Sequence, residues 1–173
     1  GKTFGVVGTG AIGARVAKIA AAFGCKVLAY SRTEKQELVD AGVQYVSLDE
    51  LLVKSDFVSL HVPLTDATRG LINADAIAKM KQGAVLLNTA RGPVVDSAAL
   101  AEALNAGKLA GAGIDVFEGE PPIAEDHPLC SAKNTVLTPH VAFASREALE
   151  TRADIVFANI EKWLNGAPQN VVK

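Results

Sequence analysis

The 173-residue sequence lacks several features that mark specialised classes of protein. Its only cysteines, Cys25 and Cys130, are too far apart for a zinc-binding spacing or a CxxC redox motif. We therefore expect two reduced thiols, no metal site and a cytoplasmic location. The formal net charge is −2 and Lys and Arg form no cluster, which argues against a nucleic-acid or anionic membrane surface.

Long apolar runs are also missing. No stretch approaches the ~18 apolar residues that a membrane-spanning helix needs, and no signal peptide precedes the first predicted strand. Apolar residues make up 49% of the chain and charged residues 21%, as in an ordinary globular domain. A domain of this length buries roughly 70% of its unfolded surface, so it needs no disulfide or metal for stability. Because the chain starts at Gly1 directly before a strand, we expect an upstream segment to be missing.

Short apolar runs rich in β-branched residues recur along the chain, with helical patterns between most of them. The runs are TFGVVGT, CKVLAYS, DFVSLHV, GAVLLNT, LAGAGID and NTVLTPH. Strands that alternate with helices predict right-handed crossovers and a mostly parallel sheet. Continuous apolarity predicts strands that are covered on both faces. We expect an α/β fold of the Rossmann type, doubly wound with helices on both faces of the sheet, over one domain, 1–173.

Three helices are predicted with some detail. A helix over 10–23 carries an apolar face opposite Arg15 and Lys18, made of Ile12, Val16, Ile19, Ala20 and Phe23. A second helix has Asp96 as its N-cap and stops at Gly107. A helix over 145–164 carries an apolar stripe of Leu149, Ala153, Val156, Ile160 and Trp163, and we expect Trp163 to be a packing residue.

The stretch GVVGTGAIG places Gly8, Gly10 and Gly13 in GxGxxG spacing between a predicted strand and a predicted helix. There the first glycine permits a tight turn, the second lets a pyrophosphate approach the backbone, and the third lets helix and strand pack closely. The helix N-terminus adds free N–H groups and a partial positive charge. Glycine turns also join strands to helices that bind nothing, but this context predicts a dinucleotide site.

Polar or charged groups follow nearly every predicted strand. They are the glycine loop from Gly8, Ser31-Arg32-Thr33, His61-Val62-Pro63, Thr89-Ala90-Arg91, Asp115 and Pro139-His140. Any one of them is explained by an ordinary turn or cap. Together they predict a binding rim, because ligands of open α/β sheets bind beyond the carboxyl ends of the strands.

Arg91, Glu120 and His140 form a candidate catalytic group. The planar guanidinium of an arginine can hold a carboxylate through two hydrogen bonds, and a histidine exchanges a proton near neutral pH. A carboxylate beside that histidine favours its protonated form. Taken singly, Arg91 is also consistent with a surface arginine, Glu120 with a solvated loop residue and His127 with an ordinary loop residue. The loop 118–134 is long for a compact domain, which indicates either function or disorder.

Four motifs resemble those of the D-isomer-specific 2-hydroxyacid dehydrogenases. They are GVVGTGAIG, HVPLTDATRGLINADAIAKMKQGAVLLNTARGPVVD, AGAGIDVFEGEPP and TPHVAFASREA, and the resemblance extends over essentially the whole chain. It implies that Arg91 binds the substrate's carboxylate and carbonyl, that His140 is the general acid and base, and that Glu120 hydrogen-bonds His140. The implied reaction is hydride transfer between nicotinamide and C2 of a small 2-keto or 2-hydroxy acid, by a homodimer.

The same resemblance implies a set of cofactor-binding residues. Asp115 would meet the nicotinamide carboxamide, and the amides of Ala11 and Ile12 would take the pyrophosphate. The other expected cofactor-binding residues are Gly8, Gly10, Gly13, Ser31, Arg32, Thr33, His61, Val62, Pro63, Thr68, Thr89, Ala90 and Ala142.

Two departures from the family pattern affect these expectations. Family members carry an N-terminal substrate domain that is absent from this chain, so we expect the domain to be inactive by itself. At the end of the second predicted strand, Ser31 occupies a position that is often aspartate in the family. Arg32 beside it can pair with the 2′-phosphate of NADP, so we predict that NADP(H) is preferred over NAD(H). Glu34, close by in the sequence, opposes this preference, and Arg32 is also consistent with stacking over the adenine or pointing into solvent.

Two other functions remain open at this level. Transcriptional corepressors that resemble these dehydrogenases use the same fold to sense NAD(H), which would make the chain a non-catalytic binding module. Formate dehydrogenase has a related NAD domain, and this part of the sequence discriminates poorly between it and the 2-hydroxyacid enzymes.

Overall fold

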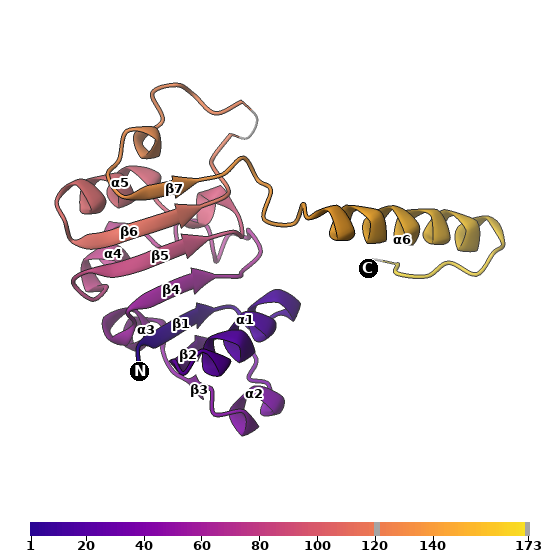
Figure 1. Cartoon of the computed structure of the whole chain (residues 1–173), viewed down its shortest axis with the longest axis horizontal. Helices are drawn as coiled ribbons and strands as arrows, with labels where there is room; N and C mark the ends of the chain where they lie inside the picture. The colour runs from indigo at the N-terminus through magenta and orange to yellow at the C-terminus, as the bar shows by residue number, and fades with distance from the viewer. Residues whose placement is uncertain (120–121, 172–173) are drawn as a thin grey trace. The chain divides into compact units, whose positions relative to one another are not determined.

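A seven-stranded parallel sheet organises the first part of the chain (Figure 1). Its strand order is β3-β2-β1-β4-β5-β6-β7. The strands are β1 (Thr3–Val7), β2 (Lys26–Tyr30), β3 (Gln44–Tyr45), β4 (Phe57–Leu60), β5 (Ala84–Asn88), β6 (Leu109–Ile114) and β7 (Thr135–Leu137). The computed structural model describes residues 1–119 and 122–171, which divide into two units, Gly1–Pro139 and His140–Lys173.

The predicted Rossmann-type α/β fold is confirmed. Each of the six predicted apolar runs contains a strand of the sheet. The sequence prediction missed β3, which pairs with β2 through Leu28–Gln44 and Ala29–Tyr45. Two residues at a sheet edge are too few to produce a recognisable apolar run.

Helices cover both faces of this sheet. They are α1 (Ala11–Ala22), α2 (Gln36–Asp40), α3 (Leu48–Lys54), α4 (Ala74–Lys79) and α5 (Ser97–Asn105), with short 3₁₀ turns at η1 (Gly92–Val94) and η2 (Pro128–Cys130). On one face, α1 and α2 share a buried cluster with Val6 of β1; on the other, α3, α4 and α5 share a larger cluster with Val7. Successive strand residues thus point to opposite faces and are buried on both, as their continuous apolarity predicts.

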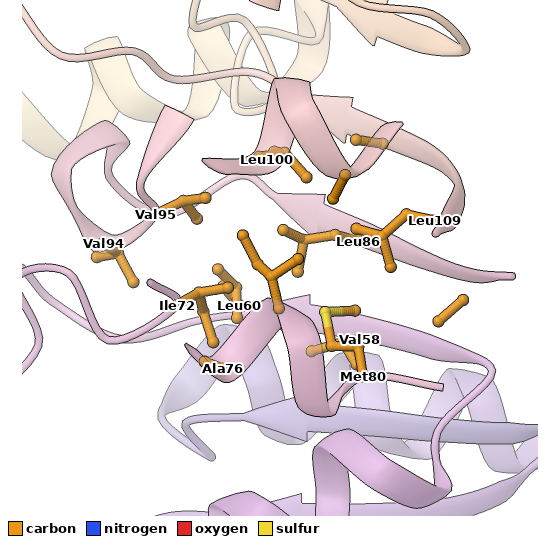
Figure 2. Close-up of a cluster of buried hydrophobic side chains, with 14 of the residues drawn as sticks. Val58, Leu60, Ile72, Ala76, Met80, Leu86, Val94, Val95, Leu100 and Leu109 are labelled. Carbon is orange, nitrogen blue, oxygen red and sulfur yellow. The ribbon is translucent and has the colours of Figure 1, made fainter. Parts of the chain in front are cut away.

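The larger cluster forms the main core of the domain (Figure 2). Leu60 of β4, Leu86 of β5, Leu100 of α5 and Ile72 are fully buried within it. Burying a leucine or isoleucine side chain stabilises the folded state by about 1.5–3 kcal/mol, so this layer holds β4, β5 and β6 rigidly. The loops at the carboxyl ends of these strands therefore start from fixed positions.

The apolar face predicted for the first helix is wrong in most of its members. Ile12 is 69% exposed, Ile19 50% and Phe23 83%, whereas the buried residues of α1 are Gly13, Ala14, Ala17 and Ala20. Only Ala20 belongs to both sets. Small side chains let the helix approach the sheet closely, so residue size decides which face of α1 is buried.

The predicted ends of the middle helix are confirmed. Asp96 is the N-cap of α5 and accepts a 3.0 Å hydrogen bond from the backbone N–H of Ala99. This bond satisfies one of the free amides of the first turn. Gly107, at φ 72°, takes the left-handed conformation that commonly follows a helix C-terminus.

The second unit consists of residues 140–145, the helix α6 (Arg146–Leu164) and the segment after it. Ser145 caps α6 by accepting a hydrogen bond from the N–H of Ala148. No residue of α6 is buried and Trp163 is 69% exposed, so the prediction of Trp163 as a packing residue is wrong for this unit. A single helix has no second layer within the unit against which to bury its stripe. Within the described residues, no helix has both the length and the apolarity to cross a membrane.

Candidate functional site

A pocket of about 370 Å³ opens at the carboxyl ends of the strands in the middle of the sheet. At this point β1 lies between β2 and β4, and the order of the strands reverses. Such a reversal is where open α/β sheets bind their ligands. The lining residues are Gly8, Thr9, Gly10, Tyr30, Ser31, Arg32, Thr33, Lys35, His61, Val62, Pro63, Thr65, Ala67, Thr68 and Leu71.

The glycine loop has the geometry of a phosphate cradle. Gly8 adopts φ 93°, which only glycine takes readily, and a Cβ on Gly13 would lie 1.9 Å from the carbonyl oxygen of Gly8. A Cβ on Gly10 would meet no atom within 4 Å, and no side chain caps α1. The first-turn amides of α1, which include those of Ala11 and Ile12, are therefore not satisfied by a cap. These features fit the pyrophosphate of a dinucleotide.

The predicted cofactor-binding residues divide into three groups by position, of which one, made of Ala11, Ile12 and Gly13, forms the first turn of α1. Those that line the pocket are Gly8, Gly10, Ser31, Arg32, Thr33, His61, Val62, Pro63 and Thr68. Thr89, Ala90 and Asp115 lie at the ends of other strands, while Ala142 belongs to the second unit. The pocket residues that sequence analysis missed are Thr9, Tyr30, Lys35, Thr65, Ala67 and Leu71. Of these, Thr9, Tyr30 and Ala67 are adjacent to a predicted residue in the chain.

The segment after β2 presents polar groups that the fold does not use. Ser31, Arg32, Thr33 and Glu34 make no hydrogen bond or ion pair within the described residues. Arg32 and Thr33 are exposed, and Arg32 lies at the pocket wall. A guanidinium without a carboxylate partner remains available to pair with an anion.

His61 lines the pocket and directly follows β4. Its Nε2 is 2.8 Å from the Oγ of Ser59, and the same residue packs against Gly13 of α1 through its Cβ. Burial lowers the pKa of His61 below its ordinary value of 6.5. The imidazole therefore stays neutral at neutral pH and offers a hydrogen bond without charge beside the glycine loop.

The lowered pKa of His61 predicts a loss of stability in mild acid. The unfolded chain takes up a proton at His61 below pH 6.5 while the folded chain does not, so the free energy of unfolding falls as pH drops from 6.5 towards the lower folded pKa. Asp56 does not contribute in this range, because hydrogen bonds from Lys81 and from the Thr3 N–H hold its pKa below 3.8.

Chemical denaturation at pH 7.5 and 5.5 measures this effect. The variant His61→Gln keeps a hydrogen-bonding side chain but cannot titrate, so its loss of stability between the two pH values should be smaller than that of the wild type. Equal losses in the two proteins would show that His61 is not responsible.

Arg91 is presented by a turn that the core holds in place. Asn88, the last residue of β5 and 1% exposed, accepts a 3.0 Å hydrogen bond from the N–H of Ala90 and donates one of 3.0 Å to the carbonyl of Arg91. Gly92 packs so closely on Phe117 that an added Cβ would lie 2.1 Å from its carbonyl carbon. The side chain of Arg91 is exposed and starts from this fixed backbone, and its guanidinium donates a 2.6 Å hydrogen bond to the carbonyl of Ala90.

Asp115 lies at the carboxyl end of β6 and is 3% exposed. Its Oδ1 accepts a hydrogen bond from the hydroxyl of Thr138, which follows the neighbouring strand β7. A buried carboxylate needs such donors, because desolvation without a partner is costly. The predicted contact of Asp115 with a nicotinamide stays a prediction.

The loop after Asp115 is anchored by a carboxylate that sequence analysis did not single out. The two carboxylate oxygens of Glu118 share the hydroxyl hydrogen of Ser97, at distances of 2.9 and 2.8 Å from its Oγ, and Oε2 of Glu118 lies 3.1 Å from Nε2 of His127. His127 also accepts a bond from the N–H of Leu129, so its Nε2 carries the hydrogen towards Glu118. His127 therefore anchors this loop, a structural role that is compatible with its interpretation as an ordinary loop residue. The predicted catalytic Glu120 lies outside the described residues.

His140 begins the second unit, so the structure describes it separately from Arg91. Its backbone adopts φ 55°, in the left-handed region that few residues other than glycine occupy. Its ring makes an edge-on contact with Phe143, with ring centroids 6.1 Å apart. Backbone strain of this kind gathers at functional positions, which supports a role for His140. Across the residues that the structure describes, no group of three or more His, Cys, Asp or Glu side chains could hold a metal ion.

Comparison with known sequences points to a single family. Residues 1–142 match the family described as D-isomer specific 2-hydroxyacid dehydrogenase, NAD binding domain. The chain is 46% identical over 172 residues to the hydroxypyruvate reductase of Blautia hydrogenotrophica, covering 99% of this chain and 53% of that protein. It is 48% identical over 174 residues to the glyoxylate reductase of Thermococcus litoralis, covering 99% and 52%. The chain therefore spans about half the length of these relatives.

Solved structures show the same likeness in space. The D-lactate dehydrogenase of Aquifex aeolicus, complexed with NAD and lactic acid, matches with a TM-score of 0.89 and 41% identity over 96% of this chain and 54% of its own. An acyclic imino acid reductase in complex with NADPH and D-Arg matches with a TM-score of 0.88 and 37% identity, over 99% and 54% of the two chains. Structures with this fold thus contain either NAD or NADPH.

Proposed function

Because this chain belongs to the D-isomer specific 2-hydroxyacid dehydrogenase family as its NAD-binding domain, we propose that it binds NADP(H) in preference to NAD(H) and carries catalytic residues for reducing a small 2-keto acid. One observation carries the cofactor choice. The segment after β2 offers Arg32 and the hydroxyls of Ser31 and Thr33 to the pocket. Among the residues that the structure describes, Arg32 has no partner and no acidic side chain lines that pocket to repel a 2′-phosphate.

The chain's own residues divide the work of the reaction. A bound nicotinamide dinucleotide supplies or accepts the hydride. The glycine loop and the N-terminus of α1 hold its pyrophosphate, and Asp115 binds its carboxamide. Arg91 binds the carboxylate and the carbonyl of the substrate, so its guanidinium both orients the acid and stabilises the charge that develops on the carbonyl oxygen.

His140, which follows β7, transfers the proton in this proposal. In the reducing direction, His140 donates a proton to the carbonyl oxygen of the 2-keto acid; in the oxidising direction it removes the proton from the hydroxyl. Glu120 holds the imidazole in the orientation and charge state that this exchange needs. The buried turn at Asn88 keeps Arg91 in place, so orienting the substrate does not require the protein backbone to order itself.

Titration of the chain with NADPH and NADH tests the cofactor proposal. A charge-assisted contact with the 2′-phosphate contributes about 1.5–3 kcal/mol, so the Kd for NADPH should be roughly ten- to a hundredfold lower than that for NADH. Arg32→Ala should remove most of this difference. Lys26→Ala takes the same formal charge from the opposite end of β2 and should leave the ratio of the two Kd values unchanged. Equal or tighter binding of NADH by the wild type would refute the preference.

The same preparation tests whether the domain works alone. The chain is expected to bind the dinucleotide without reducing glyoxylate or hydroxypyruvate at rates near ~10 per second, a typical enzyme turnover. The relatives that carry out such reductions are about twice as long. The predicted homodimer and the cytoplasmic location remain part of this proposal.

A further inference from the structure

Tyr45 occupies a position that the proposed function does not yet use. It lies on the edge strand β3, beside Ala29 of β2. Its ring packs against the buried cluster under α1 and α2, which includes Leu38. The ring is thus anchored in the apolar layer, while its hydroxyl reaches the polar rim above.

The hydroxyl of Tyr45 joins two segments that are far apart in the sequence. It donates a 3.1 Å hydrogen bond to Oγ1 of Thr9 in the glycine loop, and it accepts a 3.1 Å bond from the backbone N–H of Lys35. Thr9 is 2% exposed, and Lys35 is the residue from which α2 starts. Both residues line the cofactor pocket.

The bond to Lys35 is important because the four residues before it are not held by interactions of their own with other described residues. Ser31, Arg32, Thr33 and Glu34 form no hydrogen bond or ion pair within the described part of the chain. Their position relative to the glycine loop is therefore set at two ends, by β2 at Tyr30 and by the contacts of Lys35. The carbonyl of Lys35 accepts backbone bonds from Leu38 and Val39 of α2, and its N–H donates to the Tyr45 hydroxyl, which is the contact that continues to Thr9 in the glycine loop. Without the Tyr45 hydroxyl, more of the order of the segment relative to the glycine loop must come from the ligand, at a cost in conformational entropy.

We propose that Tyr45 is a positioning residue for cofactor selection, which holds the Ser31–Lys35 segment so that Arg32 meets the 2′-phosphate of NADP(H). The inference rests on the proposed cofactor preference. Tyr45 itself does not touch the 2′-phosphate; it acts through Arg32. The 2′-hydroxyl of NAD(H) makes no ion pair with Arg32, so binding of NADH depends far less on the placement of this segment.

The variant Tyr45→Phe tests the proposal, because it keeps the ring in its apolar contacts and removes only the hydroxyl. A lost hydrogen bond corresponds to roughly a two- to twelvefold change in binding. We expect the Kd for NADPH to rise about five- to tenfold and the Kd for NADH to change less than twofold. Thermal unfolding of the unliganded protein shows whether the substitution destabilises the whole domain. Such a loss of stability would weaken the binding of both cofactors alike.

A double-mutant cycle with Arg32→Ala separates positioning from a direct contact. If Tyr45 acts by placing Arg32, then Tyr45→Phe should not further change the ratio of the NADPH and NADH Kd values once Arg32 is gone. Gln44→Ala, on the neighbouring exposed residue of the same strand, is the control and should leave the ratio at its wild-type value.

The outcomes distinguish the role of Tyr45 from the cofactor preference on which it rests. A selective effect of Tyr45→Phe that vanishes in the Arg32→Ala background supports both. If the wild type binds NADPH selectively but Tyr45→Phe weakens both cofactors equally, or if the two substitutions add independently, the role of Tyr45 is refuted and the cofactor preference stands. If the wild type binds neither cofactor, or binds NADH as tightly as NADPH or more tightly, both are overturned. If the wild type prefers NADPH but Arg32→Ala leaves the ratio unchanged, the role of Tyr45 is refuted because it is proposed to act through Arg32, while the preference itself stands.

Discussion

Alanine at position 13 is expected to abolish dinucleotide binding and to destabilise the domain, whereas alanine at position 10 should impair binding alone. A Cβ at Gly13 would lie 1.9 Å from the backbone oxygen of Gly8, so α1 must move away from the loop. Alanine favours a helix over glycine by about 1 kcal/mol. Overpacking against rigid neighbours costs about 1–3 kcal/mol or more, so the steric term prevails.

Gly10 is the matched comparison within the same loop. Its backbone is at φ −62° and an added Cβ meets no atom within 4 Å, so Gly10→Ala should leave the melting temperature unchanged or slightly raised. The methyl group would nevertheless occupy the space that a pyrophosphate must enter. Calorimetric titration with NADPH and thermal unfolding of both variants measure the two effects. Wild-type affinity in Gly10→Ala would mean that phosphate does not approach the loop as proposed.

Replacing His140 should remove most of the catalytic rate while leaving the cofactor bound. The assay needs a two-domain protein, made by joining the amino-terminal half of the Blautia hydroxypyruvate reductase to this chain. Asparagine is the substitute of choice, because it tolerates the left-handed backbone at φ 55° better than alanine does. A positioned acid and base contributes roughly 100- to 10,000-fold, so kcat for hydroxypyruvate should fall by that factor in His140→Asn.

Cofactor affinity provides the internal control for this variant. His140 is proposed to act on the substrate oxygen, so the Kd for NADPH in His140→Asn should stay within about twofold of the parent protein. A fall in kcat of less than about tenfold would show that another group moves the proton. A large loss of cofactor affinity would instead place His140 in the dinucleotide site.

The fold was largely predictable because its signals are local. Each long strand is a continuous apolar run, and Asp96 and Gly107 mark helix ends through their own backbone preferences. The buried face of α1 was not predictable from hydrophobicity. Alanines face the sheet there, while the larger Ile12 and Phe23 remain exposed, because close approach of a helix depends on side-chain size.

Those parts of the candidate site that depend only on the order and direction of the strands were predictable. Parallel strands bring their carboxyl ends to one edge, so Arg32 and His61 fall on the same pocket although they are far apart in sequence. The supporting hydrogen bonds were not predictable. Tyr45 reaches Thr9 across the sheet, and Ser97 reaches Glu118 from the start of another helix. Such pairs depend on side-chain direction after folding, which no local pattern encodes.

The turn that carries Arg91 and the segment that carries Arg32 are attached to the fold in opposite ways. Buried Asn88 bonds the former at two points, while residues 31–34 make no bonds within the described chain. Substitutions at exposed positions without partners usually change folding free energy by no more than about 0.5 kcal/mol. Evolution can therefore exchange the exposed Arg32 or Thr33, which we propose to select the cofactor, at almost no cost to stability. The buried turn under Arg91, which we propose to orient the substrate, has no such freedom, so under this proposal cofactor choice can diverge faster than the chemistry it serves.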